Sequence, residues 1–467
     1  MWRKYFDIAT EGLIMFALLF GPWAFGSTEL WSAWVLNWVG LALGAIWLTQ
    51  QIHRGWRFLQ QTEALPLAGQ RRASIGSEPA IRKTLLILTG ILLLYCLIGA
   101  VNARAVYHLW HFSYQPCILW LPHSYDQRRS WDFFFNYLAL AGYFWATRDW
   151  LLQAHTRRSR LPARLQRILW VLSVNGLILA SVGLVQKFVG ENKLLWLVEP
   201  EINKSVNNQF GPFAYRGNGA QYFNLLWPVV LAFWLYLNKT TRREGATGWV
   251  RHRGKLLLAG LSLMVLCPLV SLSRTGAMVL LVNLLAADII IWFAFRKPLN
   301  RKFILAVFGV LGLLLAGGYF EWEQLSTRFG QLEYGYVDRM SLFIPEWQMG
   351  LDNQPFGVGP GAFSSMYQFY RPNFQDAWWA QAHNDWIEAF ITLGWIGLLL
   401  SLIPFAVILG RCFYSGGIKV RFSVIGLLWV SLGGCLVHAL VDFPFQIQSI
   451  LVLFTLICSL LSVFSKR

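Results

Sequence analysis

Long apolar runs separated by polar segments dominate this chain. A helix needs roughly 20 apolar residues to cross the hydrocarbon core of a bilayer, and runs of that length recur throughout the sequence. They are continuous and do not follow the periods of an amphipathic helix or a half-buried strand. The pattern predicts about twelve membrane-spanning helices, at residues 6–25, 30–50, 84–102, 132–152, 168–189, 217–238, 256–272, 277–295, 303–320, 385–410, 422–441 and 446–464.

Composition supports the same fold class. Of the 467 residues, 56% are hydrophobic and only 13% are charged, about half the charge of a typical soluble domain. We therefore expect an all-α fold, a polytopic membrane helix bundle. Residues 1–320 would hold nine transmembrane helices, residues 321–384 a large periplasmic loop of short helices, and residues 385–467 the last three transmembrane helices.

The net charge of +17 is a topology signal. If the N-terminus is cytoplasmic, 28 of the 40 Lys and Arg residues fall in cytoplasmic segments and only ten in outer segments. This asymmetry follows the positive-inside rule, so we expect both termini of this inner-membrane-type protein in the cytoplasm. Membrane lipids are the expected partner of the basic surface, and the charge gives no reason to expect nucleic acid.

The outer face carries three sizeable connections, at residues 103–131, 190–216 and 321–384. The last of these is acidic overall and rich in aromatic rings, which suit either an interfacial belt or a platform for sugar rings. Within it, Asp338 is predicted to cap a helix. The apolar stripe of that helix would contain Met340, Phe343, Ile344, Trp347 and Leu351.

A glycine-rich stretch at residues 355–361 follows this helix. Two interpretations stay open for its glycines. They could simply make turns, or they could let the backbone approach a phosphate group closely.

Polar residues gather where helices begin at the outer face. A helix N-terminus carries a partial positive charge and unpaired N–H groups, so several of them together would favour an anion. The residues concerned are Arg216 and Asn218, then Ser271, Ser273 and Arg274, then His383, Asn384 and Asp385, and finally His438, Asp442 and Gln446.

Each candidate also has an ordinary structural explanation. Arg216 and Arg274 could extend to the membrane surface from helix ends, His383 could be an interfacial histidine, and His438 could pair with Asp442 at a helix end. Chemically, arginine binds phosphate in a fork, and a neutral imidazole can accept a proton near pH 7. No cluster of His and Cys residues suggests a metal site, and only Cys117 of the six cysteines faces the oxidising side.

Five stretches resemble the motifs of the O-antigen ligase and O-antigen polymerase family, in the same order along the chain. The large-loop motif has Arg339 ahead of the glycine-rich stretch. The five stretches are residues 211–228 (GPFAYRGNGAQYFNLLWP), 271–277 (SLSRTGA), Arg339 with 355–363 (PFGVGPGAF), 382–397 beginning AHNDW, and 438–444 (HALVDFP).

The resemblance implies a membrane glycosyltransferase that needs no metal or other cofactor. Such enzymes move a glycan from undecaprenyl pyrophosphate to a sugar hydroxyl of a lipid A core or a polysaccharide at the periplasmic face. Arg216 and Arg339 would stabilise the leaving pyrophosphate, and His383 would position or deprotonate the acceptor, with inversion at the sugar carbon. Substrate-binding residues would be Arg274, Asn218, Asn384, Asp385 and Asp442.

Three alternatives stay open. A polymerase that joins repeat units needs the same donor and the same kind of acceptor as a ligase. A small-anion transporter should carry ionisable groups near the middle of the membrane, where Asp288 is the candidate. A scaffold for envelope assembly would tolerate the loss of His383.

Overall fold

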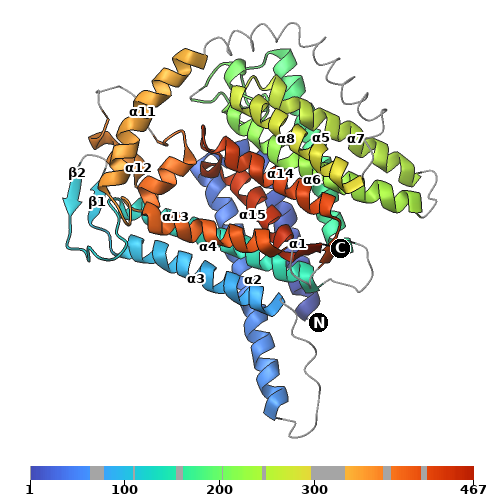
Figure 1. Ribbon diagram of the computed structural model, residues 1–467, viewed down its shortest axis with the longest axis horizontal. Helices are drawn as coiled ribbons and strands as arrows, with labels where there is room; N and C mark the ends of the chain where they lie inside the picture. Colours follow the sequence, from blue (N-terminus) through green and yellow to red (C-terminus); the bar gives the residue numbers. More distant parts are fainter. Residues whose placement is uncertain are drawn as a thin grey trace.

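The protein is a bundle of α-helices (Figure 1). The computed structural model describes residues 2–63, 78–108, 111–153, 161–201, 203–243, 249–295, 332–371, 380–411 and 418–466. Its helices are α1 (Trp2–Trp23), α2 (Leu30–Glu63), α3 (Glu78–Val101), α4 (Gln127–Gln153), α5 (Ala163–Val189), α6 (Arg216–Arg243), α7 (Trp249–Val270), α8 (Arg274–Phe295), α11 (Leu332–Asp352), α12 (Phe363–Met366), α13 (Asp385–Arg411), α14 (Phe422–His438) and α15 (Gln448–Val463).

The predicted spans coincide with these helices, except that residues 303–320 lie outside the described residues. Eight of the described helices are long and apolar enough to cross a membrane. The helices α14 and α15 are apolar but shorter, at 17 and 16 residues. The chain is therefore a polytopic membrane protein, while the division at residues 320 and 384 stays a prediction.

The helices pack around a continuous apolar core. Helix α14 packs against α6 and α8, α15 packs against α4, and α13 packs against α3 and α11 (Figure 1). The crossing of α2 and α4 depends on two glycines, because a Cβ added to Gly142 would lie 2.0 Å from the carbonyl oxygen of Gly40. Small residues at such crossings let helix backbones approach closely within a membrane.

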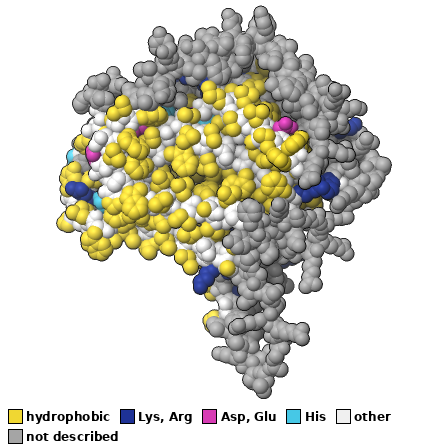
Figure 2. Space-filling view, in the orientation of Figure 1, with side chains coloured by type: hydrophobic (Ala, Val, Ile, Leu, Met, Phe, Trp, Pro, Cys, Tyr) yellow, Lys and Arg dark blue, Asp and Glu magenta, His cyan; other side chains and the backbone are white. Residues whose placement is uncertain are grey.

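Hydrophobic side chains cover much of the visible surface in Figure 2. Many large hydrophobic helix residues are exposed, and Trp38, Leu94 and Phe293 are each more than half exposed. An exposed apolar surface of this extent is unfavourable in water and suits contact with lipid.

Contacts between distant helix ends define two faces of the bundle. At one face Arg164, near the start of α5, pairs with Asp7 of α1 at 2.6 Å. At the other face Ser449, near the start of α15, donates a hydrogen bond to the carbonyl of Gly26 between α1 and α2. The arrangement agrees with helices that alternate in direction; that the first face is cytoplasmic stays a prediction.

Two small β-ladders accompany the bundle in the described residues. Strands β1 (Ala105–His108) and β2 (His111–Tyr114) form an antiparallel hairpin after α3. Strands β3 (Ile418–Val420) and β4 (Phe464–Lys466) pair in parallel beside the start of α14 and the end of α15.

Helix α11 is longer than the sequence predicts. It begins at Leu332, so Asp338 lies inside it and the predicted N-cap is wrong. Of the predicted stripe, Ile344, Trp347 and Leu351 are exposed. The buried side of the helix includes Glu346, which is only 2% exposed. A prediction from apolar spacing cannot find a buried side of a helix that contains a carboxyl group.

The glycine-rich stretch packs against a break in α13. Gly394 interrupts that helix with φ 61° and ψ −179°. The backbone N–H groups of Val358 and Gly359 donate to the carbonyls of Ile391 and Thr392, at 2.8 and 3.1 Å. A Cβ added to Gly357 would lie 2.5 Å from the carbonyl oxygen of Ile391. These glycines therefore allow close approach to protein backbone, so a phosphate has no access to this surface of the stretch.

Candidate active site

Asp442 is the centre of a polar cluster where α14 ends, before α15 begins. Its side chain is 3% exposed. The hydroxyl of Tyr215 donates to its Oδ2 at 3.0 Å, and the backbone N–H of Phe443 donates to its Oδ1 at 3.1 Å. The Nε2 atom of His438 lies 3.5 Å from Oδ2. Such partners offset the large free-energy cost of burying a carboxylate.

His383 lies beside this carboxylate, immediately before α13. Its side chain is 29% exposed, and its Nδ1 atom is 4.0 Å from Oδ1 of Asp442. The ring also contacts the ring of Phe443 edge-on, with centroids 5.0 Å apart. A negative charge at this distance stabilises the imidazolium that forms when His383 accepts a proton. The histidine can therefore act as a base while remaining accessible.

Two neighbours of His383 fix the start of α13. The Oδ1 atom of Asn384 accepts hydrogen bonds from the backbone N–H groups of Trp386 and Ile387, at 3.0 and 3.1 Å. Asn384 is thus a helix N-cap. The side chain of Asp385 accepts from the backbone N–H of Phe445 at 2.7 Å, which ties α13 to the segment before α15. Both residues hold the backbone around His383 in place.

Glu388 provides a further contact that the sequence did not assign to the site. Its Oε2 atom accepts a hydrogen bond at 2.9 Å from the backbone N–H of Ala382. The next residue, His383, has a φ of 49°, a left-handed conformation that costs a non-glycine residue free energy. Glu388 lies four residues after the Asn384 cap, one more than in a capping box, so the capping-box spacing does not identify it.

Arg216 begins α6, next to Tyr215 in the chain. Its Nη1 atom donates to the carbonyl of Asn207 at 2.8 Å and to Oδ1 of Asn208 at 3.0 Å. Asn218, two residues into the helix, is buried. The structure thus places Arg216 next to the Tyr215–Asp442 contact, with its guanidinium group bound to the turn at residues 206–208.

Arg274 begins α8, and its neighbours serve the packing of this helix. Ser273 caps the helix, since its hydroxyl accepts a hydrogen bond at 3.1 Å from the N–H of Gly276. A Cβ added to Gly276 would lie 2.4 Å from the Cβ of Ala220 in α6. The short motif therefore holds the starts of α6 and α8 close together and leaves Arg274 half-buried there.

Arg339 is part of α11, but its side chain lies outside the described residues. Helix α11 packs against α13, and the Trp347 ring stacks on Phe390 with centroids 5.1 Å apart. The helix that carries Arg339 is thus docked on the helix that follows His383.

Glu346 makes this docking sensitive to pH. Burial, reinforced by the nearby Glu388 carboxyl, raises the pKa of Glu346 from 4.5 to about 9. The folded protein keeps the proton up to about pH 9, whereas the unfolded chain releases it near pH 4.5. Folding therefore takes up a proton between these values, and stability falls as pH rises through this window.

Glu346→Gln is expected to remove that dependence. The wild-type free energy of unfolding should fall by up to about 1.4 kcal/mol per pH unit across the window, because one proton is involved. Thermal unfolding in detergent at several pH values measures this slope. The exposed Asp352 of the same helix supplies the control, and Asp352→Asn should keep the wild-type slope. An unchanged slope in Glu346→Gln would contradict the prediction.

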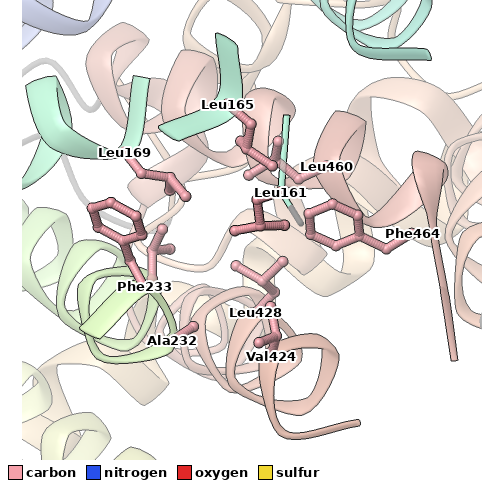
Figure 3. Close-up of a pocket in the computed structure, with 10 residues that line it drawn as sticks. Leu161, Leu165, Leu169, Ala232, Phe233, Val424, Leu428, Leu460 and Phe464 are labelled. Carbon is pink, nitrogen blue, oxygen red and sulfur yellow. The ribbon is translucent and has the colours of Figure 1, made fainter. Parts of the chain in front are cut away.

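A small apolar cavity elsewhere in the described structure offers little to a ligand. A cavity of about 20 Å³ lies between α5, α6, α14 and α15 (Figure 3), and carbon side chains such as Leu165, Phe233 and Phe464 line it. An apolar space of this size holds at most one water molecule and provides no partner for a phosphate. Among the described residues, no group of three His, Cys, Asp or Glu side chains is arranged to hold a metal ion.

Comparison with protein-family models gives a match over residues 259–402, to the family described as O-antigen ligase. The matched residues include Arg274, Arg339 and His383, whereas Arg216 and Asp442 lie outside them. A search of curated proteins finds no match. Residues 259–402 of this polytopic membrane protein are therefore similar to the O-antigen ligase family.

Proposed function

We propose that the protein is a membrane glycosyltransferase. It moves a glycan from undecaprenyl pyrophosphate to a sugar hydroxyl at the periplasmic face, as in ligation of O-antigen to a lipid A core. The family match supports transfer from a lipid-linked donor. The observation that carries the proposal is the imidazole of His383 beside Asp442, one contact away from Tyr215 and the start of α6.

In this reaction His383 accepts the proton of the acceptor hydroxyl as its oxygen attacks the anomeric carbon. The bond from that carbon to the pyrophosphate oxygen breaks, the electron pair leaves with the pyrophosphate, and the sugar carbon is inverted. Asp442 stabilises the imidazolium. Arg216 and Arg339 stabilise the charge that builds on the leaving group, and Arg274 supports the same phosphates.

Asn384 and Asp385 act on the backbone, by holding His383 and the segment before α15 in register. Asn218 lies buried two residues after Arg216, in the first turn of α6. These three residues position the reacting groups, so their substitution should reduce transfer less than substitution of His383.

A polymerase of the same family would use the same groups, and the glycan profile of a deletion strain separates the two activities. Loss of the whole attached polysaccharide indicates a ligase. Retention of one attached repeat unit indicates a polymerase. Transport gains no support from Asp288, because this residue is exposed on α8 and does not face the bundle interior as a transport site would.

The arginine roles are tested with purified protein in nanodiscs. Arg216→Ala and Arg339→Ala should each lower transfer from an undecaprenyl-pyrophosphate-linked glycan by about 100-fold, since each removes one charged donor from the leaving group. Arg339→Lys should also remain impaired, because an ammonium cannot reproduce the guanidinium fork. The exposed Arg128 supplies the control, and Arg128→Ala should transfer normally. Normal transfer by both alanine variants of Arg216 and Arg339 would rule out these roles.

A further inference from the structure

Lys187 is a buried cation at the outer end of α5, with only 6% of its surface exposed. Its Nζ atom donates to the carbonyl of Val206 at 3.1 Å and to Oδ1 of Asn207 at 3.2 Å. Burying an ammonium is costly, and it requires donor–acceptor contacts of this kind. The contacts reach about twenty residues along the chain, to the turn that also binds Arg216.

The turn, η2 (Val206–Asn208), lies between the two cations. Lys187 uses the side-chain oxygen of Asn207, and Arg216 uses the backbone oxygen of the same residue. The turn is fixed from other sides too, because the N–H of Val206 donates to Oδ1 of Asn192 at 2.7 Å. A movement of Asn207 would therefore change the position of the Arg216 guanidinium.

From this geometry we infer that Lys187 is a positioning residue for Arg216 in donor binding. The ammonium holds Asn207, and Asn207 holds the guanidinium that meets the pyrophosphate. The second positive charge beside the same turn also raises the potential for an anion. The inference rests on the proposed role of Arg216 and names a residue outside the recognised motifs.

The test is a donor titration in the transfer assay, with the full chain in nanodiscs. Lys187→Met should raise the KM for the lipid-linked donor about tenfold, as the loss of charge-assisted hydrogen bonds implies, with little change in kcat. Lys187→Arg should restore KM to within about threefold of the wild type. The exposed Lys204, in the same loop, gives the matched control, and Lys204→Met should leave KM unchanged.

Coupling separates positioning from a general effect on the fold. If Lys187 acts through Arg216, the double variant Lys187→Met with Arg216→Lys should bind donor no worse than Arg216→Lys alone. Inhibition by inorganic pyrophosphate should weaken in parallel. Should Lys187→Met fold poorly, Asn207→Ala replaces it as the test. This variant removes the side-chain oxygen that Lys187 binds and keeps both cations, and it should raise the KM for the donor in the same way.

An unchanged KM in both Lys187→Met and Asn207→Ala overturns the inference. The inference is also overturned if the increase in KM of the double variant equals the product of the increases in the two single variants. If Arg216→Lys itself leaves both donor KM and transfer at the wild-type level, the proposed function of Arg216 fails, and this outcome is distinct from a failure of Lys187 alone.

Discussion

Replacing His383 with alanine is expected to lower the rate of glycan transfer by about 1,000-fold. General-base help is typically worth 100- to 10,000-fold, and His383 is the accessible base of the described cluster. Its ring lies 4.0 Å from the Asp442 carboxylate, which stabilises the protonated form. The measurement is single-turnover transfer at saturating donor, where binding does not mask the chemical step.

Two further variants make the His383 test specific. His383→Gln keeps a polar side chain that cannot accept the proton, so it should stay within about tenfold of the alanine variant. His123 is another half-buried histidine outside the spans, with Nδ1 3.1 Å from the carbonyl of Leu121. His123→Ala should transfer normally. Transfer by His383→Ala at more than a tenth of the wild-type rate would favour a non-catalytic role.

The helices follow from the sequence because each depends on a local property. About 20 apolar residues must pair their backbone groups internally in lipid, and an α-helix does so without help from distant residues. The spans at α1, α5 and α6 are therefore predictable to within a few residues. The N-cap at Asp338 failed because α11 starts nearly two turns earlier, at Leu332.

The polar residues of the candidate site can be picked out from the sequence, but the contacts between them cannot. His383, Arg216 and Asp442 stand out as polar residues at helix ends in an apolar chain. Tyr215 and Lys187 do not, because their roles come from contacts with Asp442 and Asn207, and apolar periodicity does not encode such pairings. Tyr215 and Asp442 are 227 positions apart in the chain, so their hydrogen bond can be found only from the folded structure.

Residues of one motif divide between chemistry and packing. Arg274 has the proposed role of supporting the phosphates, whereas Gly276 two residues later lets α8 approach α6. The side-chain amide of Asn224 donates to the carbonyl of Gly276 at 2.9 Å and strengthens the same contact. A motif read from sequence alone gives these residues equal weight, but only the arginine carries a charge that can act on a substrate.

Gly394→Ala is expected to cause the largest loss of stability, above about 3 kcal/mol. The backbone at φ 61° and ψ −179° lies in a region that is essentially restricted to glycine. An added Cβ would also lie 2.1 Å from the carbonyl oxygen of Pro355, so the two segments would have to separate. The yield of monodisperse protein in detergent and its melting temperature measure the effect.

Separating Gly394 from Pro355 should also disturb the candidate active site, because further contacts at the break in α13 would be lost with it. The hydroxyl of Tyr95 donates to the carbonyl of Leu393, and the N–H of Trp395 donates to Oε1 of Gln354 at 2.8 Å. These bonds satisfy backbone groups that a continuous helix would pair internally. Losing them would release the first part of α13, which follows His383, so transfer should fall together with stability.

Gly433 provides the matched control for this prediction. It lies inside α14, and a Cβ added there meets nothing within 4 Å. Gly433→Ala should keep wild-type stability or gain up to about 1 kcal/mol, because alanine favours a helix over glycine. A melting temperature for Gly394→Ala equal to that of Gly433→Ala would mean that α13 is not anchored by the glycine-rich stretch. Other contacts would then have to hold the start of α13, and with it His383, in place.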